Sequence, residues 1–367
     1  MSDIADPQML REHGFRWVDQ SYGEGEELAG RKLAAGYDAQ TAAKIAELGW
    51  FGVMVAADKG GIGGGLPEMV AVMEAVGRGL VAEPVLSQGG IAAPLLDRLG
   101  TADADALLAR LVDGTSTAVL LHNEADAGFE RTLSTSRIEP DGNGYRLTAA
   151  KAPTLDAAGA STLLVTALHP DGRMAVVALD AGADGLRRTT FRSVDGRALA
   201  RFDLDNIKVS AEAIVSGPSD ATRHVERVLD EASILVCAEA VGAMAVLVEQ
   251  TSDYLRTRRQ FGTALSSFQV LQHRMVDMLL ASEEASAVVE AALDAAGGPG
   301  RQRAFALAKI VTARSARFVA QQAVQLHGGI GMTDELKVSR YFRRLMQCET
   351  LFGDADWHAE RFDRMRG

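Results

Sequence analysis

The sequence predicts a mainly helical protein with a small antiparallel β-domain between two helical domains. Residues 1–115 carry apolar side chains three and four positions apart, the spacing of amphipathic helices. Residues 116–218 change to short runs of β-branched and aliphatic residues, which turn sequences such as PDGNG and HPDGR separate. In residues 219–367 the helical spacing returns in four long segments, the pattern of a four-helix bundle.

The N-terminal domain contains two clear helical segments, AQTAAKIAELGW and LPEMVAVMEAVGRGL. The glycine-rich stretch DKGGIGGG, at 58–65, lies between them. A phosphate-binding loop would follow a strand and precede a Lys-Ser or Lys-Thr pair, whereas Leu66 and Pro67 follow here. We therefore interpret the stretch as a loop between two helices.

The β-domain is predicted from five short segments bounded by turn signals. They read STAVLLH, GYRLTAAK, STLLVTAL, MAVVALD and ARFDLDNIKV. Short strands at this spacing are typical of a small antiparallel barrel or sandwich. Among the helical segments that follow, the third ends at Gly328 and Gly329, as expected of a helix C-terminus.

Composition narrows the function classes. The chain has 367 residues, of which 47% are hydrophobic and 24% charged, the usual values for a globular protein. A net charge of -11 argues against a general nucleic-acid or membrane-surface role, because both need basic patches.

The remaining sequence-wide features point to a cytoplasmic enzyme without a metal. Cys237 and Cys348 lie in apolar helical patterns, so we expect buried free thiols, and no Cys/His cluster has metal spacing. The first residues do not resemble a signal peptide. We find no apolar run of the roughly 20 residues that a membrane span needs.

Two segments in the last third of the chain carry the strongest functional signal. Residues 258–269 read RRQFGTALSSFQ, and residues 325–335 read QLHGGIGMTDE. Arg-x-x-Phe-Gly followed by Gln-x-His-Gly-Gly-x-Gly resembles the flavin-binding apparatus of the acyl-CoA dehydrogenase family. The order of the three domains extends the resemblance over essentially the whole chain. It implies an acyl-CoA dehydrogenase-like fold and FAD-dependent α,β-dehydrogenation of an acyl-CoA thioester.

The resemblance also implies which residues contact FAD. Arg258 and Phe261 match positions that reach the FAD of a neighbouring subunit, and an arginine suits a pyrophosphate because its guanidinium donates two charge-assisted hydrogen bonds. Gln325 and the backbones of Gly328 and Gly329 match positions that contact the dinucleotide. Glycines there allow close approach of backbone N–H groups to phosphate.

The β-domain departs from the family at its flavin-contacting strand. Where the family usually reads Thr-Glu-Pro-x-Ala-Gly-Ser, this chain reads Asn123-Glu124-Ala125-Asp126-Ala127-Gly128-Phe129. Asn123 replaces a threonine that bonds the flavin, and its amide can still donate or accept a hydrogen bond. The family's tryptophan on the next strand is replaced near Pro153.

The catalytic base is absent from its usual position. Most of the family carries a glutamate in Tyr-Glu-Gly-Thr, and Phe352 stands there in this chain. A minority of the family places the base at a position that falls on Ala232, one residue from Glu231. Glu239 interrupts the apolar run ILVCAEAVGAM. Burying a carboxylic acid costs free energy, so a buried acid is expected to have a functional or structural role. Glu239 is our first candidate base, with Glu231 and Asp354 as alternatives; a structural carboxylate at Glu239, and no base on this chain, stay open.

The resemblance implies partners as well. Sharing FAD between subunits implies an obligate dimer or tetramer, and electron-transfer flavoprotein is the expected acceptor. The C-terminal sequence resembles a subgroup that includes heteromeric steroid-degrading members, so fatty-acid or steroid degradation, and a heterotetramer with a homologous chain, are both expected. Two alternatives stay open: a non-catalytic subunit that completes an FAD site, and a flavin monooxygenase or oxidase on the same fold.

Overall fold

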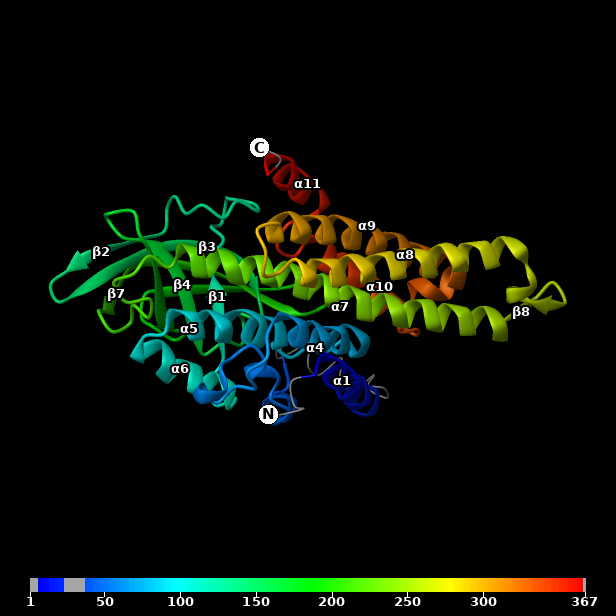
Figure 1. Ribbon diagram of the computed structural model, residues 1–367, viewed down its shortest axis with the longest axis horizontal. Helices are drawn as coiled ribbons and strands as arrows, with labels where there is room; N and C mark the ends of the chain where they lie inside the picture. Colours follow the sequence, from blue (N-terminus) through cyan, green and yellow to red (C-terminus); the bar gives the residue numbers. More distant parts are fainter. Residues whose placement is uncertain (1–5, 23–36, 366–367) are drawn as a thin grey trace. The chain divides into compact units, whose positions relative to one another are not determined.

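The computed structural model describes residues 6–22 and 37–365 (Figure 1). The chain divides into two compact units. We call the first, which contains Gly25–Met69 and Ala82–Ala232, the β unit. We call the second, which contains Pro7–Glu24, Val70–Val81 and Ser233–Gly367, the helical unit. Helical N- and C-terminal regions around a central sheet confirm the predicted fold class.

Short helices precede the sheet in the β unit. They are α3 (Ala39–Glu47), η2 (Trp50–Gly52), η3 (Ala57–Lys59), η4 (Val85–Ala92), α5 (Ala93–Leu99) and α6 (Ala102–Val112). Two begin at an N-cap side chain, since Asp38 accepts from the Thr41 amide and Thr101 from the Ala104 amide. The glycine-rich stretch at 58–65 begins in η3 and continues as a loop, and a Cβ on Gly61 would collide with the carbonyl of Val55.

A seven-stranded sheet forms the rest of the β unit. Its strands are β1 (Ala118–Leu121), β2 (Arg137–Asp141), β3 (Gly144–Leu155), β4 (Thr162–Leu168), β5 (Met174–Asp180), β6 (Leu186–Arg192) and β7 (Ala198–Ser210). The order is β1-β4-β2-β3-β7-β6, and β5 pairs with β4. Our expectation of a purely antiparallel sheet is wrong at two pairings, because β1 and β2 each pair with β4 in parallel. A sequence pattern shows where strands form, but which strands pair, and in which direction, depends on long-range packing.

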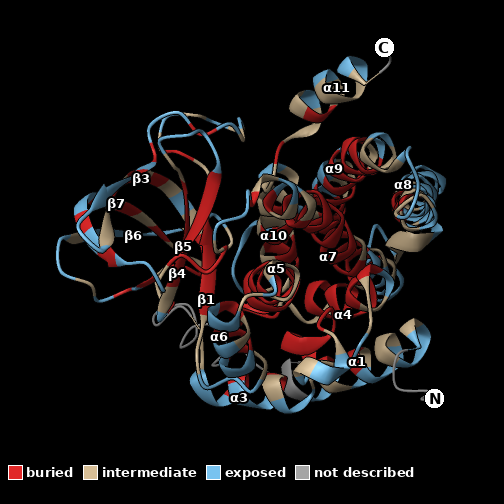
Figure 2. Ribbon diagram, turned by 60° about the vertical axis from the view of Figure 1, so that its left-hand side comes forward, coloured by how far each residue is buried: buried red, intermediate tan, exposed pale blue. Residues whose placement is uncertain are grey.

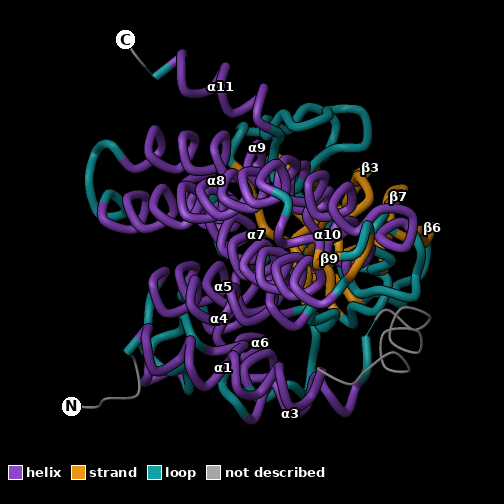
Figure 3. The backbone as a smooth tube through the Cα atoms, turned by 90° about the vertical axis from the view of Figure 1, so that its right-hand side faces the viewer, coloured by secondary structure: helices purple, strands orange, loops and turns teal. Residues whose placement is uncertain are grey.

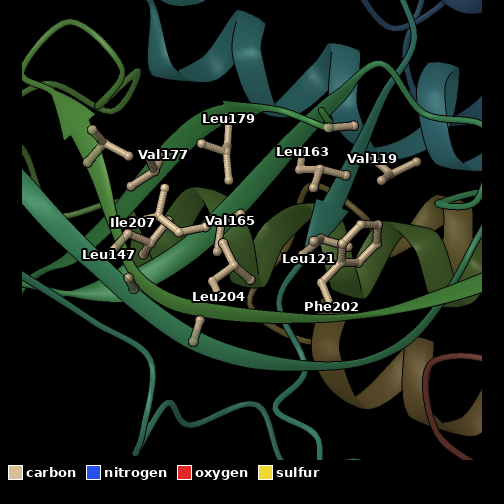
Figure 4. Packing of buried hydrophobic residues seen from close by; sticks show 14 of the residues in the cluster. Val119, Leu121, Leu147, Leu163, Val165, Val177, Leu179, Phe202, Leu204 and Ile207 are labelled. Carbon is tan, nitrogen blue, oxygen red and sulfur yellow. The ribbon is translucent and has the colours of Figure 1, made fainter. Parts of the chain in front are cut away.

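The core of the sheet is built from aliphatic side chains around one phenylalanine (Figure 4). Phe202 on β7 is fully buried, and Leu163 and Val165 on β4 belong to the same cluster. Strand β4 is buried at every residue from Leu163 to Ala167. A strand buried on both faces has a continuous apolar sequence instead of an alternating one. This fits β4, which pairs with β1, β2 and β5.

The helical unit consists mainly of long helices (Figure 3). The helices that lie wholly or mostly in this unit are α1 (Pro7–Tyr22), α4 (Leu66–Gly79), α7 (Thr222–Thr257), α8 (Gln269–Asp294), α9 (Arg301–His327), α10 (Val338–Thr350) and α11 (Ala355–Arg364). The first residues of α4 and α7 belong to the β unit. Helices α7 and α8 are joined by a hairpin of two short strands, β8 (Arg259–Gln260) and β9 (Thr263–Ala264), and then by η5 (Leu265–Ser267). The short helix η6 (Gly328–Met332) follows α9. Helix α9 packs against α8, α10 and α11.

Helices α4 and α7 approach each other at two glycines. A Cβ on Gly77 would collide with the carbonyl oxygen of Glu239, and a Cβ on Gly242 with that of Glu74. Glycine at both contacts lets the two backbones touch, which a larger residue would prevent.

Helix α7 corrects one expectation. Among the described residues it is the one helix long and apolar enough to cross a membrane by length and composition, although we expected no such run. Within its most apolar stretch, 83% of the residues are buried inside the protein (Figure 2). The same test is passed by core helices of soluble proteins, so the apolar surface of α7 is accounted for by packing.

Candidate functional site

The first flavin motif forms a strained, exposed hairpin. Phe261 and Gly262 connect β8 to β9 with φ of 55° and 80°, so both residues lie in the left-handed region. Two consecutive positive φ values match the turn that suits a two-residue hairpin, which normally carries Asn-Gly. Phe261 is nevertheless 86% exposed, and its ring meets Phe268 edge-on at 6.1 Å. A bulky ring on a strained, solvent-facing turn indicates a binding role.

The second flavin motif lies at the end of α9. Gln325, Gly328 and Gly329 are exposed, and Gly328 has φ of 69°. No atom lies within 4 Å of a Cβ built on either glycine, so the backbone here has open space beside it. The Gly328 N–H donates to the carbonyls of Val324 and Gln325, so the space beside the two glycines lets a ligand approach the backbone of a capped helix end.

A stacked pair of rings brings the two motifs to the same end of the helical unit. Tyr254, one turn before Arg258, stacks on His327 with ring centroids 4.4 Å apart, and its hydroxyl donates to the His327 carbonyl at 3.3 Å. His327 Nδ1 lies 2.8 Å from the Ala323 carbonyl, and burial lowers the pKa of this histidine. Both rings are visible in the sequence, but they lie 73 residues apart, so only the fold shows that they are in contact.

The segment that begins at Asn123 is fixed to β3 of the β unit. The Asn123 carbonyl accepts from the Ala152 amide at 2.9 Å. Glu124 is buried and accepts from the backbone amides of Ser134, Thr135 and Ser136. These hydrogen bonds favour the charged carboxylate and lower the pKa of Glu124, against the opposing effect of burial.

A buried lysine lies beneath this segment. Lys151 Nζ donates to the His122 carbonyl at 2.9 Å and to Thr166 Oγ1 at 3.3 Å. Burial lowers the pKa of Lys151 to about 7 and that of His122 to about 4. His122 Nε2 lies 2.8 Å from the Arg131 carbonyl, which can only accept, so the Nε2 atom carries the proton. Sequence reasoning missed this cluster, because a single lysine in a strand carries no signal of burial.

The first two candidate bases are paired with arginines. Glu239 on α7 has no exposed surface and lies 2.6 Å from Arg344 of α10, which also donates to the Val81 carbonyl. Glu231 is also buried and lies 2.7 Å from Arg98 and 2.5 Å from Arg227.

The third candidate, Asp354, caps a helix. Its Oδ1 accepts from the Trp357 amide at 2.9 Å at the start of α11. All three carboxylates therefore already have structural partners. Within the described part of the chain, no group of three His, Cys, Asp or Glu side chains is placed to hold a metal.

Comparison with known proteins identifies the family. The model of the acyl-CoA dehydrogenase N-terminal domain matches residues 5–115, and that of the C-terminal domain matches residues 222–364. The chain is 30% identical to the probable acyl-CoA dehydrogenase YngJ of Bacillus subtilis, over 83% of each chain. It belongs to the acyl-CoA dehydrogenase family. The predicted family and enzyme class are thereby confirmed.

Solved structures extend the comparison. The Tcur3481-Tcur3483 steroid ACAD has 26% identity and a TM-score of 0.85, with 98% of this chain and 97% of that chain covered. The ChsE4-ChsE5 complex of Mycobacterium tuberculosis has 25% identity and a TM-score of 0.87, with 99% and 97% covered. A glutaryl-CoA dehydrogenase of Mycobacterium smegmatis, solved with FADH2, has 20% identity and a TM-score of 0.89, with 100% and 95% covered, and supports the fold alone.

Proposed function

We propose that this chain is an FAD-binding subunit of an acyl-CoA dehydrogenase that catalyses α,β-dehydrogenation of an acyl-CoA thioester. The observation that carries the proposal is the contact of Tyr254, one turn before the first motif, with His327 of the second motif, which brings both motifs to one end of the helical unit. When bound, FAD supplies the hydride acceptor for such a reaction. The solved relative with FADH2 agrees with this cofactor.

The residues at this end suit a dinucleotide shared between subunits. Arg258 is exposed and offers a guanidinium for the pyrophosphate, and Phe261 offers an aromatic face beside it. Gln325 and the backbones of Gly328 and Gly329 supply polar groups beside open space. Because Arg258 and Phe261 both face solvent, they are available to a second subunit's FAD.

On the β unit, Asn123 is the proposed contact to the flavin ring. Its side chain is half-buried, and its carbonyl is bonded to β3. The hydrogen bond fixes the backbone at Asn123, and its side-chain amide can donate to or accept from a ring nitrogen or oxygen.

We further propose that a homologous partner chain supplies the catalytic base. Glu239 and Glu231 are held by arginines, and Asp354 caps α11, so each would leave a structural partner to take a substrate proton. Phe352 has no acidic group. In this proposal the acyl chain of the substrate lies beside Phe352, which shapes its site. The second candidate, a self-sufficient dehydrogenase with Glu239 as base, is favoured only by that carboxylate's place in an apolar helix.

The comparisons support further details of the proposal. Two solved relatives are named as pairs of chains, and one is described as a steroid ACAD, so we propose a heteromeric assembly that acts on a steroid-derived or branched acyl-CoA. Electron-transfer flavoprotein is the proposed acceptor, and the cytoplasm the proposed location. An oxidase or monooxygenase would instead consume oxygen rapidly once its flavin is reduced.

The deciding experiment compares the chain alone with the chain co-purified with a homologous partner. Each preparation is titrated anaerobically with short, long and steroid-type acyl-CoA thioesters while the flavin absorbance is followed. We expect bleaching only in the presence of the partner. Bleaching of the chain alone would contradict the missing base and return Glu239 to the leading position.

The cofactor assignment has its own test at Arg258. The Arg258→Ala variant is expected to lose most of its FAD and to weaken assembly, because a charge-assisted pyrophosphate contact is removed. Arg256→Ala is the matched control: it removes a 70% exposed arginine two residues earlier whose partner is Asp253. Flavin-to-protein ratios from absorbance decide the point. Equal flavin content in both variants would overturn the assignment.

A further inference from the structure

The turn between α10 and α11 has a backbone that its residues disfavour. Phe352 has φ of 60° and Gly353 has φ of 107°. A left-handed conformation is uncommon for a bulky side chain and costs stability. A Cβ on Gly353 would collide with the ring of Trp357, so no other residue fits there without rearrangement. Such strain persists only where the surroundings impose it.

A buried lysine holds the turn from one side. Lys309 on α9 is fully buried, and its Nζ donates to the carbonyls of Cys348 at 2.6 Å and Glu349 at 3.2 Å. These carbonyls belong to the last turn of α10, where no amide of the helix can reach them. Burial lowers the pKa of Lys309, and the carbonyl end of a helix favours a positive charge.

A buried histidine holds the turn from the other side. His358 on α11 has no exposed surface, and its Nε2 lies 3.0 Å from the Phe352 carbonyl. Because a carbonyl only accepts, Nε2 carries the proton and donates it. Asp354 fixes the next residues by capping α11. Side chains from α9 and α11 thus contact the backbone around the turn. Lys309 donates to carbonyls four and three residues before Phe352, and His358 donates to the carbonyl of Phe352 itself.

We propose that Lys309 and His358 are positioning residues that impose the strained conformation of the Phe352 turn, so that the Phe352 ring bounds the acyl site and sets substrate affinity. The inference rests on the proposed function, which places the acyl chain beside Phe352. Two buried polar side chains from different helices contact carbonyls within residues 348–352, at the end of α10 and in the turn after it. The backbone of that turn is one that phenylalanine alone would not adopt. The three observations are independent of one another.

The test uses the flavin-loaded protein with its partner chain and the acyl-CoA that perturbs the wild-type flavin spectrum. His358→Ala removes the donor to Phe352, whereas His358→Asn keeps a side-chain N–H. We expect His358→Ala to raise the acyl-CoA dissociation constant about tenfold or more, because small displacements near a reacting group have large effects. His358→Asn should recover much of the affinity, and FAD content should not change. Amide hydrogen exchange of residues 351–354 should quicken in His358→Ala.

Thr251→Val is the matched control for general loss of stability. Thr251 is buried on α7, and its hydroxyl donates to the Leu247 carbonyl, so the variant also loses one buried hydrogen bond, away from the turn. It should lower the melting temperature without changing acyl-CoA affinity. Lys309→Met should act like His358→Ala; if Lys309→Met does not fold, the histidine variants decide.

Two outcomes separate this inference from the proposed function. Wild-type protein that binds acyl-CoA with the same affinity as His358→Ala would overturn the positioning role alone. Flavin-loaded wild-type protein whose spectrum responds to no acyl-CoA would overturn the proposed substrate and the positioning role together.

Discussion

Two buried carboxylates of this protein are paired with arginines far away in the sequence. Glu239 pairs with Arg344, 105 positions later, and Asp230 pairs with Arg131, 99 positions earlier. A buried ion pair contributes little net stability, but removing one partner leaves an uncompensated charge. These residues therefore fix which elements pack together, and their loss should affect folding before chemistry.

The Glu239→Gln variant tests whether the Glu239–Arg344 ion pair serves folding or catalysis. We expect a loss of about 3–5 kcal/mol in the free energy of unfolding, because Arg344 stays buried without its carboxylate. Flavin reduction in the partner-containing enzyme should keep its wild-type rate. Denaturant unfolding and anaerobic stopped-flow absorbance measure the two effects. Abolished reduction with unchanged stability would make Glu239 the base.

Lys151 makes stability depend on pH. Its pKa is lowered from 10.5 to about 7 in the folded protein, so between these values the unfolded chain binds more protons. Its contribution to the free energy of unfolding is therefore most unfavourable below pH 7 and improves as pH rises toward 10.5. Burial raises the pKa of Glu83 from 4.5 to about 7, so Glu83 lowers stability as pH rises toward and just past 7 and opposes Lys151 at the lower end of this range. Because Lys151→Met keeps Glu83, the comparison with that variant removes its effect.

The pH prediction is checked by comparing unfolding free energies at pH 7 and 9. Wild type should gain stability across this range relative to Lys151→Met, which has no amine to protonate. Lys208→Met, a change at an exposed lysine of β7, should keep the wild-type slope. An identical slope in wild type and Lys151→Met would show that the buried amine does not titrate there.

Two Phe-Gly turns show how single elements carry strain. Phe261-Gly262 closes the β8–β9 hairpin and Phe352-Gly353 joins α10 to α11, and all four residues have positive φ. Backbone preference does not explain either phenylalanine, since asparagine adopts a positive φ more readily. The Phe261 ring is exposed, so its burial does not stabilise the folded chain.

Phe261→Asn should therefore separate folding from cofactor binding. Asn-Gly is the preferred pair for this hairpin, so the melting temperature of the chain should stay level or rise. FAD retention should fall, because in the proposed function the Phe261 ring is the aromatic face that contacts a neighbouring subunit's FAD. Thermal unfolding and flavin-to-protein ratio are measured on the same sample. Full FAD retention would contradict the assigned role of Phe261.

At the scale of the whole molecule, α8 exposes apolar residues that the folded chain leaves uncovered. Only five of its 26 residues are buried, and Val270, Val276, Leu279 and Leu280 are all exposed (Figure 2). Large exposed apolar side chains gathered on one helix mark an interaction surface. We interpret α8 as part of the proposed subunit interface.

Leu280→Glu tests that surface. A charge placed in an apolar interface should weaken assembly by about 2 kcal/mol or more, and FAD should be lost with the partner subunit. Glu283→Gln, an exposed change one turn further along α8, is the control. Sedimentation over a range of concentrations measures the assembly. Unchanged assembly in Leu280→Glu would place the interface elsewhere.

The sequence was sufficient for the order of the helical and β regions, because these are local patterns. The two motifs are also local patterns, and their contacts with FAD stay a prediction. A change of period from helix to strand and back is visible in short windows, and so are Arg258 and Gly328 within their motifs. The parallel pairing of β1 with β4, and the Glu239–Arg344 and Lys309–Cys348 contacts, join distant segments. Such contacts depend on packing that no window contains.

Helix α7 poses a problem of timing during synthesis. It contacts α9 through Tyr254 and α10 through Glu239, and both of these helices are made after it. At roughly 5–20 residues per second, several seconds pass between the emergence of α7 from the ribosome and that of α10. For that interval a helix apolar enough to enter a membrane has neither partner. During this interval the apolar surface of α7 must be covered by the earlier-made α4 or by other components of the cell. A chain truncated before α9 should therefore be insoluble.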